Sequence, residues 1–238
     1  MTVGSKVAPS GTFDPMITVV RPEARATIAA VSTLHLIPPE LSSRFDVFEW
    51  RNATAILQAA YPTEWADIVA VLSGFELRRS EVESAGGSKS PIAKRLDEPL
   101  ARRGWIEHGF DTKILVDGRA YDAPTHKVDC FKGGVALEVE WNNKDPFFDR
   151  DLNNFRLLFE LRAIGVGVIV TRSSELQQVF DDLGKGKSYG NSTTHLGKLI
   201  PKVDGGGGGG CPVLAFGITR ACFVDDVDGA HTQSGTVF

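Results

Sequence analysis

The fold is decided by residues 128–141, which read VDCFKGGVALEVEW. In residues 135–141, large apolar side chains alternate with alanine or glutamate, which is the two-residue period of a β-strand. Lys132-Gly133-Gly134 predicts a tight turn, and residues 125–129 predict a second strand before it. We therefore expect two strands that can pair as a hairpin.

Three carboxylates lie in this hairpin. Glu138 and Glu140 share one face of the strand with the small Ala136, because alternate residues point to the same side. Asp129 ends the preceding strand, so the turn brings it close to Glu138. The opposite face carries the side chains that we assign to the core, namely Val135, Leu137, Val139 and Trp141.

Two interpretations of the carboxylates compete. Two glutamates on the open face of an antiparallel strand ordinarily form a solvated face. Three converging carboxylates instead repel one another unless a divalent cation joins them, and Mg²⁺ prefers such oxygen ligands. A cation held this way activates water and stabilises charge on a phosphoryl group, and a third carboxylate can accept a proton. Asp129, upstream across the turn, makes the metal site about as well supported as the solvated face.

The remaining sequence predicts a mixed α/β protein with a central mixed β-sheet flanked by helices. Pro62 divides a helical stretch over 51–73, and Ser90-Pro91 begins a helix that ends at Gly104. Asp149 or Asp151 is the expected N-cap of a helix that ends near residue 162. Another helix is predicted over 174–183, and further strands over 113–116, 166–171 and 213–218.

The chain of 238 residues suits one domain. We expect a flexible N-terminal segment over 1–22, a single folded domain over 23–224 and a disordered tail over 225–238. Six consecutive glycines at 205–210 predict a mobile connector before the last strand.

Charge and cysteine content narrow the class of protein. The net charge is −4, which argues against nucleic-acid binding unless basic residues gather at one surface. Residues 184–202 carry four lysines and no acid, and residues 78–103 carry seven basic against four acidic side chains. Three dispersed cysteines indicate neither a disulfide framework nor a zinc site, and fit a reducing cytoplasm. No membrane span or secretory signal is expected.

The segment 128–141 resembles the active-site segment of BglII/BstYI-type restriction endonucleases, which belong to the PD-(D/E)xK nuclease superfamily. The family pattern is an aspartate, eight residues and then Glu-x-Gln or Glu-x-Glu, which Asp129, Glu138 and Glu140 match without a gap. Further similarity runs over residues ~45 to 220 by eye. Glu140 stands where the superfamily usually has a lysine.

The resemblance implies a restriction-endonuclease-like core and a metal-dependent hydrolysis of DNA. It implies that Asp129 and Glu138 bind Mg²⁺ and that Glu140 is the general base. It further implies a homodimer that hydrolyses double-stranded DNA to 5′-phosphate ends, and a cognate DNA methyltransferase as its functional partner. A two-fold protein also matches a two-fold DNA site.

Two polar segments are candidates for DNA contact. Asn142, Asn143 and Lys144 directly follow Glu140, and they form either a DNA contact or an ordinary polar connection. The second segment is rich in hydroxyls and cations, which make most phosphate contacts, and its hydroxyls could also cap a short helix. Its candidate residues are Ser192, Thr193, Thr194, His195 and Lys198. A lone histidine such as His195 is more often structural.

The leading hypothesis is a type II restriction endonuclease. A repair or mobile-element nuclease with little sequence specificity shares the same fold, and a non-catalytic DNA-binding module is a third possibility. The intact acidic triad argues against the binding module. A glycosidase that uses Glu138 and Glu140 is disfavoured, because residues two apart on a strand lie too close for the inverting geometry.

Overall fold

The computed structural model describes residues 32–84, 90–122, 125–190 and 192–227. The predicted N-terminal segment and most of the predicted tail lie outside these residues, so the domain boundaries stay predictions. Within the described residues, a mixed sheet of six strands confirms the α/β fold. Its strand order is β1 (Phe45–Trp50), β9 (Val213–Ile218), β8 (Val166–Arg172), β7 (Val135–Val139), β6 (Val128–Lys132) and β3 (Ile106–His108).

Strand direction divides the sheet into a parallel centre and antiparallel edges. β7 and β9 run parallel to β8, whereas β1, β6 and β3 each pair antiparallel with a neighbour. Two small sheets lie apart from it, β4 (Lys113–Val116) with β5 (Arg119–Asp122) and β2 (Leu77–Arg78) with β10 (Phe223–Val224). The predicted strand 113–116 is therefore correct but belongs to a separate hairpin.

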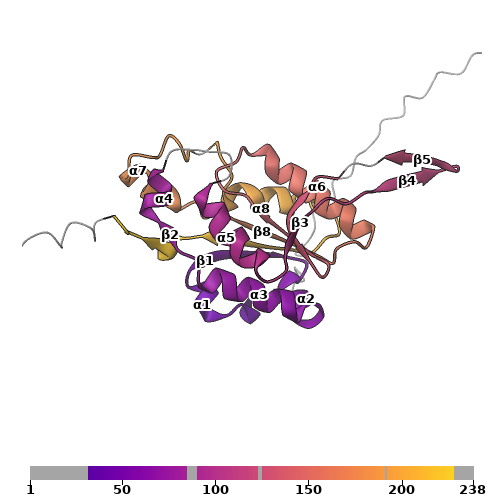
Figure 1. Ribbon diagram of the computed structural model, residues 1–238, viewed down its shortest axis with the longest axis horizontal. Helices are drawn as coiled ribbons and strands as arrows, with labels where there is room; N and C mark the ends of the chain where they lie inside the picture. The colour runs from indigo at the N-terminus through magenta and orange to yellow at the C-terminus, as the bar shows by residue number, and fades with distance from the viewer. Residues whose placement is uncertain (1–31, 85–89, 123–124, 191, 228–238) are drawn as a thin grey trace, which may run out of the picture. The chain divides into compact units, whose positions relative to one another are not determined.

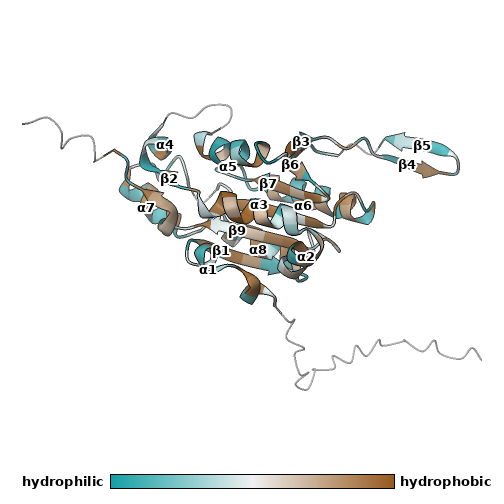
Figure 2. Ribbon diagram, turned by 60° about the horizontal axis from the view of Figure 1, so that its bottom comes forward, coloured by the Kyte–Doolittle hydropathy of each residue, from teal (hydrophilic) through white to brown (hydrophobic). Residues whose placement is uncertain are grey.

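Helices cover both faces of the sheet (Figure 1). One face packs against α1 (Pro39–Ser42), α2 (Ala53–Ala60), α3 (Pro62–Ser73), α4 (Arg79–Glu83), α5 (Pro91–Ala101) and α7 (Leu176–Asp182). The other packs against α6 (Pro146–Glu160) and α8 (Leu196–Asp204). Two short 3₁₀ helices, Leu34–Leu36 and Arg220–Cys222, complete the described elements. Figure 2 shows the central strands mostly in brown, as expected for strands buried on both faces.

Local signals explain where several helices begin. The break between α2 and α3 falls at Pro62, as predicted. Ser90 caps α5, because its hydroxyl accepts a hydrogen bond from the Ala93 amide at 3.0 Å. In the described part of the chain, no helix is long and apolar enough to cross a membrane.

Two predicted helix caps are wrong. α6 begins at Pro146 with Asp145 at the N-cap position, so Asp149 lies in its first turn and Asp151 in its interior. The predicted capping by Ser192, Thr193 or Thr194 also fails, because α8 begins at Leu196 and its N-cap residue is His195. Both errors have the same cause: a helix can begin without a side-chain cap, so a residue that is able to cap does not fix where the helix begins.

The glutamate face of β7 is not open, which corrects the solvated-face interpretation. Every residue of β7 is buried, and α6 packs over the face that carries Ala136 and Glu138. Gly167 of β8, paired with Ala136, permits this close approach. A Cβ atom at Gly167 would lie 2.3 Å from the Phe155 ring of α6. The small pair Gly167 and Ala136 thus lets the helix cover the strand.

The six glycines form a hydrogen-bonded turn after α8. The Gly207 amide donates to the Lys202 carbonyl at 2.9 Å, and Gly206 and Gly209 both have positive φ. A Cβ at Gly209 would lie 2.6 Å from Arg156 of α6. The predicted connector therefore has a defined path against α6, and glycine suits it because larger residues would collide.

Candidate active site

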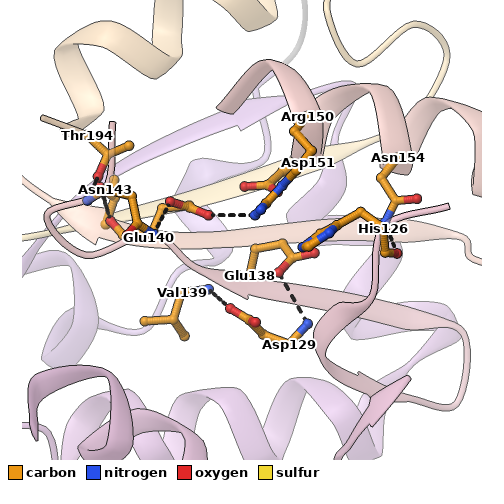
Figure 3. A network of polar contacts seen from close by, with 11 residues as sticks. His126, Asp129, Glu138, Val139, Glu140, Asn143, Arg150, Asp151, Asn154 and Thr194 are labelled. Carbon is orange, nitrogen blue, oxygen red and sulfur yellow. Dashed lines mark hydrogen bonds and ion pairs between the residues drawn. The ribbon is translucent and has the colours of Figure 1, made fainter. Parts of the chain in front are cut away.

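The β6–β7 hairpin places Asp129 beside Glu138, as predicted (Figure 3). The Asp129 amide donates to the Glu138 carboxylate at 3.2 Å, and the Val139 amide donates to the Asp129 carboxylate at 3.2 Å. Beyond the last paired residues of β6 and β7, these two amides thus bond to carboxylates. The reciprocal bonds hold both acidic side chains at the end of the hairpin pairing.

A fourth carboxylate joins the three that the sequence predicted. Asp151 projects from α6 towards β7, and its side chain is fully buried. Glu138 and Glu140 are also buried, at 0% and 1% exposure. The cluster therefore lies between the sheet and α6, in an environment that disfavours negative charge.

The cluster has few hydrogen-bond donors. Asn143 donates from Nδ2 to Glu140 at 2.6 Å, and Arg150 bridges Glu140 at 3.3 Å and Asp151 at 2.9 Å. Among the described residues, Glu138 Oε1 and Asp151 Oδ2 are buried with no hydrogen-bond partner. A buried carboxylate oxygen without a hydrogen-bond donor lowers the stability of the fold, so this site lacks compensating positive charge.

Burial also controls protonation at the site. It raises the pKa of Glu138 well above its usual range, and the nearby Asp151 and Asp129 charges raise it further. Burial together with Asp151 raises the pKa of Glu140 to about 9. Burial likewise raises the pKa of Asp151. The cluster therefore retains protons at neutral pH until a cation displaces them.

The donor set fits a divalent cation. The orphaned Glu138 and Asp151 oxygens are hard ligands of the kind that Mg²⁺ takes, and the cluster can supply the negative charge. In the described part of the chain, no three His, Cys, Asp or Glu side chains are grouped around one metal position. Figure 3 shows the Asp129 carboxylate turned towards the Val139 amide, so a side-chain rotation would be needed to complete the ligand set.

Arg150 and Asp151 were missed by sequence reasoning, which treated Asp151 only as a possible helix cap. The available signal was periodicity. Asp151 falls three residues after Phe148 and four before Phe155, so it lies on the buried stripe of α6. An acidic residue on an apolar helix face that packs against two glutamates indicates a functional cluster.

The two predicted DNA-contact segments lie side by side. Lys144 and Thr193 form an antiparallel bridge, and the Thr194 amide donates to the Asn143 carbonyl at 2.8 Å. The Thr194 hydroxyl donates to the Glu140 carbonyl at 3.2 Å. Residues roughly fifty positions apart thus meet at the end of β7, directly beside Glu140.

These segments differ in exposure. Lys144 and Ser192 are exposed, whereas Asn142, Asn143, Thr193, His195 and Lys198 are half-buried. Thr194 is fully buried and its hydroxyl bonds internally, so its position suits a structural role. His195 Nδ1 lies 3.0 Å from the Ser174 hydroxyl. The exposed members leave a polar surface beside the carboxylates.

The basic stretch 78–103 is largely neutralised by internal ion pairs. Arg78 contacts Glu76 at 2.9 Å, and Arg95 contacts Glu81 at 2.6 Å. Lys202 of the other basic stretch pairs with Asp149 at 2.8 Å. Within the described residues, Lys144 and Lys198 form no ion pair, so no carboxylate of this part of the chain offsets their charges.

A mixed sheet with a carboxylate cluster on two adjacent strands, next to a polar surface, is consistent with a restriction-endonuclease fold. A model of the family described as restriction endonuclease BglII/BglIII matches residues 45–218. The chain belongs to this BglII/BglIII restriction endonuclease family, and the resemblance inferred from residues 128–141 is confirmed. The family acts on double-stranded DNA, so the chain is of a nuclease class. A search of curated proteins found no match.

Proposed function

We propose that the protein is a type II restriction endonuclease that requires Mg²⁺ and hydrolyses double-stranded DNA at a specific sequence to 5′-phosphate ends. The observation that carries this proposal is the cluster of half-buried Asp129 with buried Glu138, Glu140 and Asp151, in which two carboxylate oxygens have no hydrogen-bond partner among the described residues. A protein does not gain stability from such a cluster, so its chemistry is the better explanation.

Asp129 and Glu138 are the proposed Mg²⁺ ligands, and Glu140 is the proposed general base. A bound Mg²⁺ supplies positive charge for the scissile phosphate and acidifies its coordinated water. Glu140 suits proton acceptance because Asn143 and Arg150 orient its two oxygens. Its raised pKa makes the ionised form a strong base once the cluster has been neutralised.

The proposed DNA surface comprises Asn142, Asn143, Lys144, Ser192, Thr193, His195 and Lys198. Lys144 and Lys198 would contact phosphates, and the amide and hydroxyl side chains can contact phosphates or base edges. We further propose a cytoplasmic homodimer, with one active site for each DNA strand, and a cognate methyltransferase that protects the host DNA.

Cleavage of unmethylated phage DNA, with Mg²⁺ or with EDTA, tests this function. We expect discrete fragments that need both Mg²⁺ and Glu138, and sequencing of their ends gives the site and the stagger. The Glu138→Ala variant should lose cleavage. Glu160→Ala removes an exposed glutamate from the end of α6 and should cleave normally.

Other outcomes distinguish the alternatives. A smear of fragments would indicate a nuclease with little sequence specificity. Binding without cleavage on several unmethylated DNAs would contradict the enzyme and favour a non-catalytic DNA-binding module. Cleavage that persists in Glu138→Ala would show that the buried carboxylates are not the active site.

A further inference from the structure

Arg150 is the cation that forms ion pairs with the carboxylate cluster. Its guanidinium donates to Asp151 Oδ1 from Nε at 3.0 Å and from Nη2 at 2.9 Å, and it contacts Glu140 Oε1 at 3.3 Å. Among the described residues, it is the only Lys or Arg that forms an ion pair with this cluster. One cation therefore serves at least two buried carboxylates.

Arg150 lies on the solvent side of the cluster. About a third of its side chain is exposed (34%), whereas the side chains of Glu140 and Asp151 are 2% and 0% exposed. The guanidinium also lies over the Phe147 ring, 4.3 Å from its centroid. Arg150 is therefore more accessible to solvent than the two carboxylates that it contacts, and Figure 3 shows it between α6 and these side chains.

These contacts leave the cluster incompletely paired. Arg150 satisfies Asp151 Oδ1, whereas Asp151 Oδ2 and Glu138 Oε1 have no hydrogen-bond partner among the described residues. A divalent cation could bind oxygens that the guanidinium cannot reach, and it carries twice the charge. With that cation bound, Arg150 would become an excess positive charge beside the site, which favours an anion.

We propose that Arg150 is an exchangeable counter-cation. In the metal-free protein it is the ion-pair partner of Glu140 and Asp151, and when a divalent cation binds the cluster, Arg150 turns to the scissile phosphate of the DNA. The planar guanidinium suits both partners, because carboxylate and phosphate accept the same paired hydrogen bonds. This inference rests on the proposed nuclease function. The superfamily usually has a lysine at the position of Glu140, and Arg150 of α6 would supply the positive charge that this strand lacks.

Ca²⁺ binding by calorimetry and duplex binding by fluorescence anisotropy test the exchange. Near pH 9, where protons compete less for Glu140, Arg150→Gln should bind Ca²⁺ about threefold to tenfold more tightly than the wild type, because a competing cation is gone. In saturating Ca²⁺, it should bind the duplex about tenfold less tightly. The slope of the logarithm of its duplex affinity against the logarithm of salt concentration should fall in magnitude by roughly one, as expected for one lost phosphate contact.

Arg156→Gln is the matched control, because Arg156 is an exposed arginine of the same helix that bonds only to Asn153 among the described residues. It should leave the Ca²⁺ affinity unchanged. Arg150→Lys should be intermediate in both assays, because a single ammonium group cannot bridge two carboxylates as a guanidinium does. This second variant serves the test if Arg150→Gln does not fold.

Opposite shifts in Ca²⁺ and duplex affinity separate exchange from a merely structural ion pair, which would weaken both. Unchanged or weaker Ca²⁺ binding by Arg150→Gln would overturn the inference, as would duplex binding equal to that of the wild type. If the wild type cleaves DNA and binds Ca²⁺, such results reject only the role of Arg150. A wild type that does neither rejects the proposed nuclease as well.

Discussion

Charge burial dominates the behaviour of single residues at the active site. Glu138, Glu140 and Asp151 lie in the low-dielectric space between β7 and α6, and burial is the largest cause of the raised pKa of each. A carboxyl group whose pKa is higher in the folded than in the unfolded protein favours folding while it is protonated. This contribution to the free energy of unfolding is fully present below the group's pKa in the unfolded chain. It is lost as the pH rises through the group's pKa in the folded protein.

Replacing Glu140 with glutamine should separate stability from activity. In EDTA near pH 9, Glu140→Gln should be more stable than the wild type by at least about 1 kcal/mol, because the amide has no proton to lose. Its cleavage activity should be abolished. Urea unfolding followed by circular dichroism measures the stability, and Glu160→Gln should change it by less than about 0.5 kcal/mol. A less stable Glu140→Gln protein under these conditions would refute the burial argument.

Arg172 is a second buried charge, and it holds the segment that contains Thr193. Its Nη2 donates to the carbonyls of Tyr189 at 3.0 Å and Gly190 at 3.2 Å, and to the Thr193 hydroxyl at 3.2 Å. Burial lowers the pKa of Arg172 to about 10, so it stays charged at neutral pH. In the described residues it forms no ion pair, so its charge is balanced by carbonyl dipoles.

Arg172→Met should destabilise the protein by about 1–3 kcal/mol, because the buried Tyr189 carbonyl and the half-buried Gly190 carbonyl lose their donor. Hydrogen exchange of residues 188–190 and 192–194 should accelerate more than exchange in β8. Arg156→Met, at an exposed position, is the control. Wild-type stability together with wild-type exchange in Arg172→Met would show that the segment holds its shape without the guanidinium.

At the scale of elements, α6 has two functions along its length. Its N-terminal half brings Arg150 and Asp151 to the carboxylates of β7. Its C-terminal half packs Phe155 and Leu158 into the core. The helix can serve both only if it lies close to the sheet, and Gly167 of β8 allows this approach.

Gly167→Ala should therefore destabilise the protein by about 1–3 kcal/mol, because the new methyl group collides with the buried Phe155 ring. Displacement of α6 should also slow cleavage. Gly74→Ala is the matched control, because its Cβ would meet only ordinary contacts at 3.6 Å or more. Thermal unfolding of both variants measures the effect. Equal stability of the two would mean that Phe155 moves aside freely.

At the scale of the whole molecule, the cluster couples metal binding to pH. The chain carries a net charge of −4, and its active site retains protons that a divalent cation must displace. Proton release on metal binding makes the affinity rise with pH. The metal-free protein should show the opposite trend, because its raised carboxyl pKa values make ionisation destabilising.

Thermal unfolding from about pH 5 to pH 9 tests this coupling. In EDTA, stability should fall with pH by up to about 1.4 kcal/mol per unit for each raised carboxyl. Added Mg²⁺ should restore stability, and the gain should be larger at pH 9 than near pH 6. Glu138→Gln should flatten both trends. A Mg²⁺ gain that does not depend on pH would contradict the coupling.

The sequence by itself determined the features that depend on neighbouring residues. Alternation over 135–141, the Gly133-Gly134 turn and the spacing of Asp129 from Glu138 are local properties, and the hairpin is confirmed. Its strand bounds differ from the predicted 125–129 and 135–141, because β6 spans Val128–Lys132 and β7 ends at Val139. Pro62 and Ser90-Pro91 marked helix boundaries because proline and a capping hydroxyl act within one turn. Family membership followed from the same segment.

Only the tertiary structure decided what covers the glutamates and what surrounds them. The parallel pairing of β7 with β8 and the packing of α6 join residues distant in sequence, and no local pattern specifies such pairings. Burial of Glu138, the placement of Arg150 and Asp151, and the contact between Lys144 and Thr193 all follow from them. Local periodicity places a side chain on a face of its element, whereas long-range packing decides what that face meets.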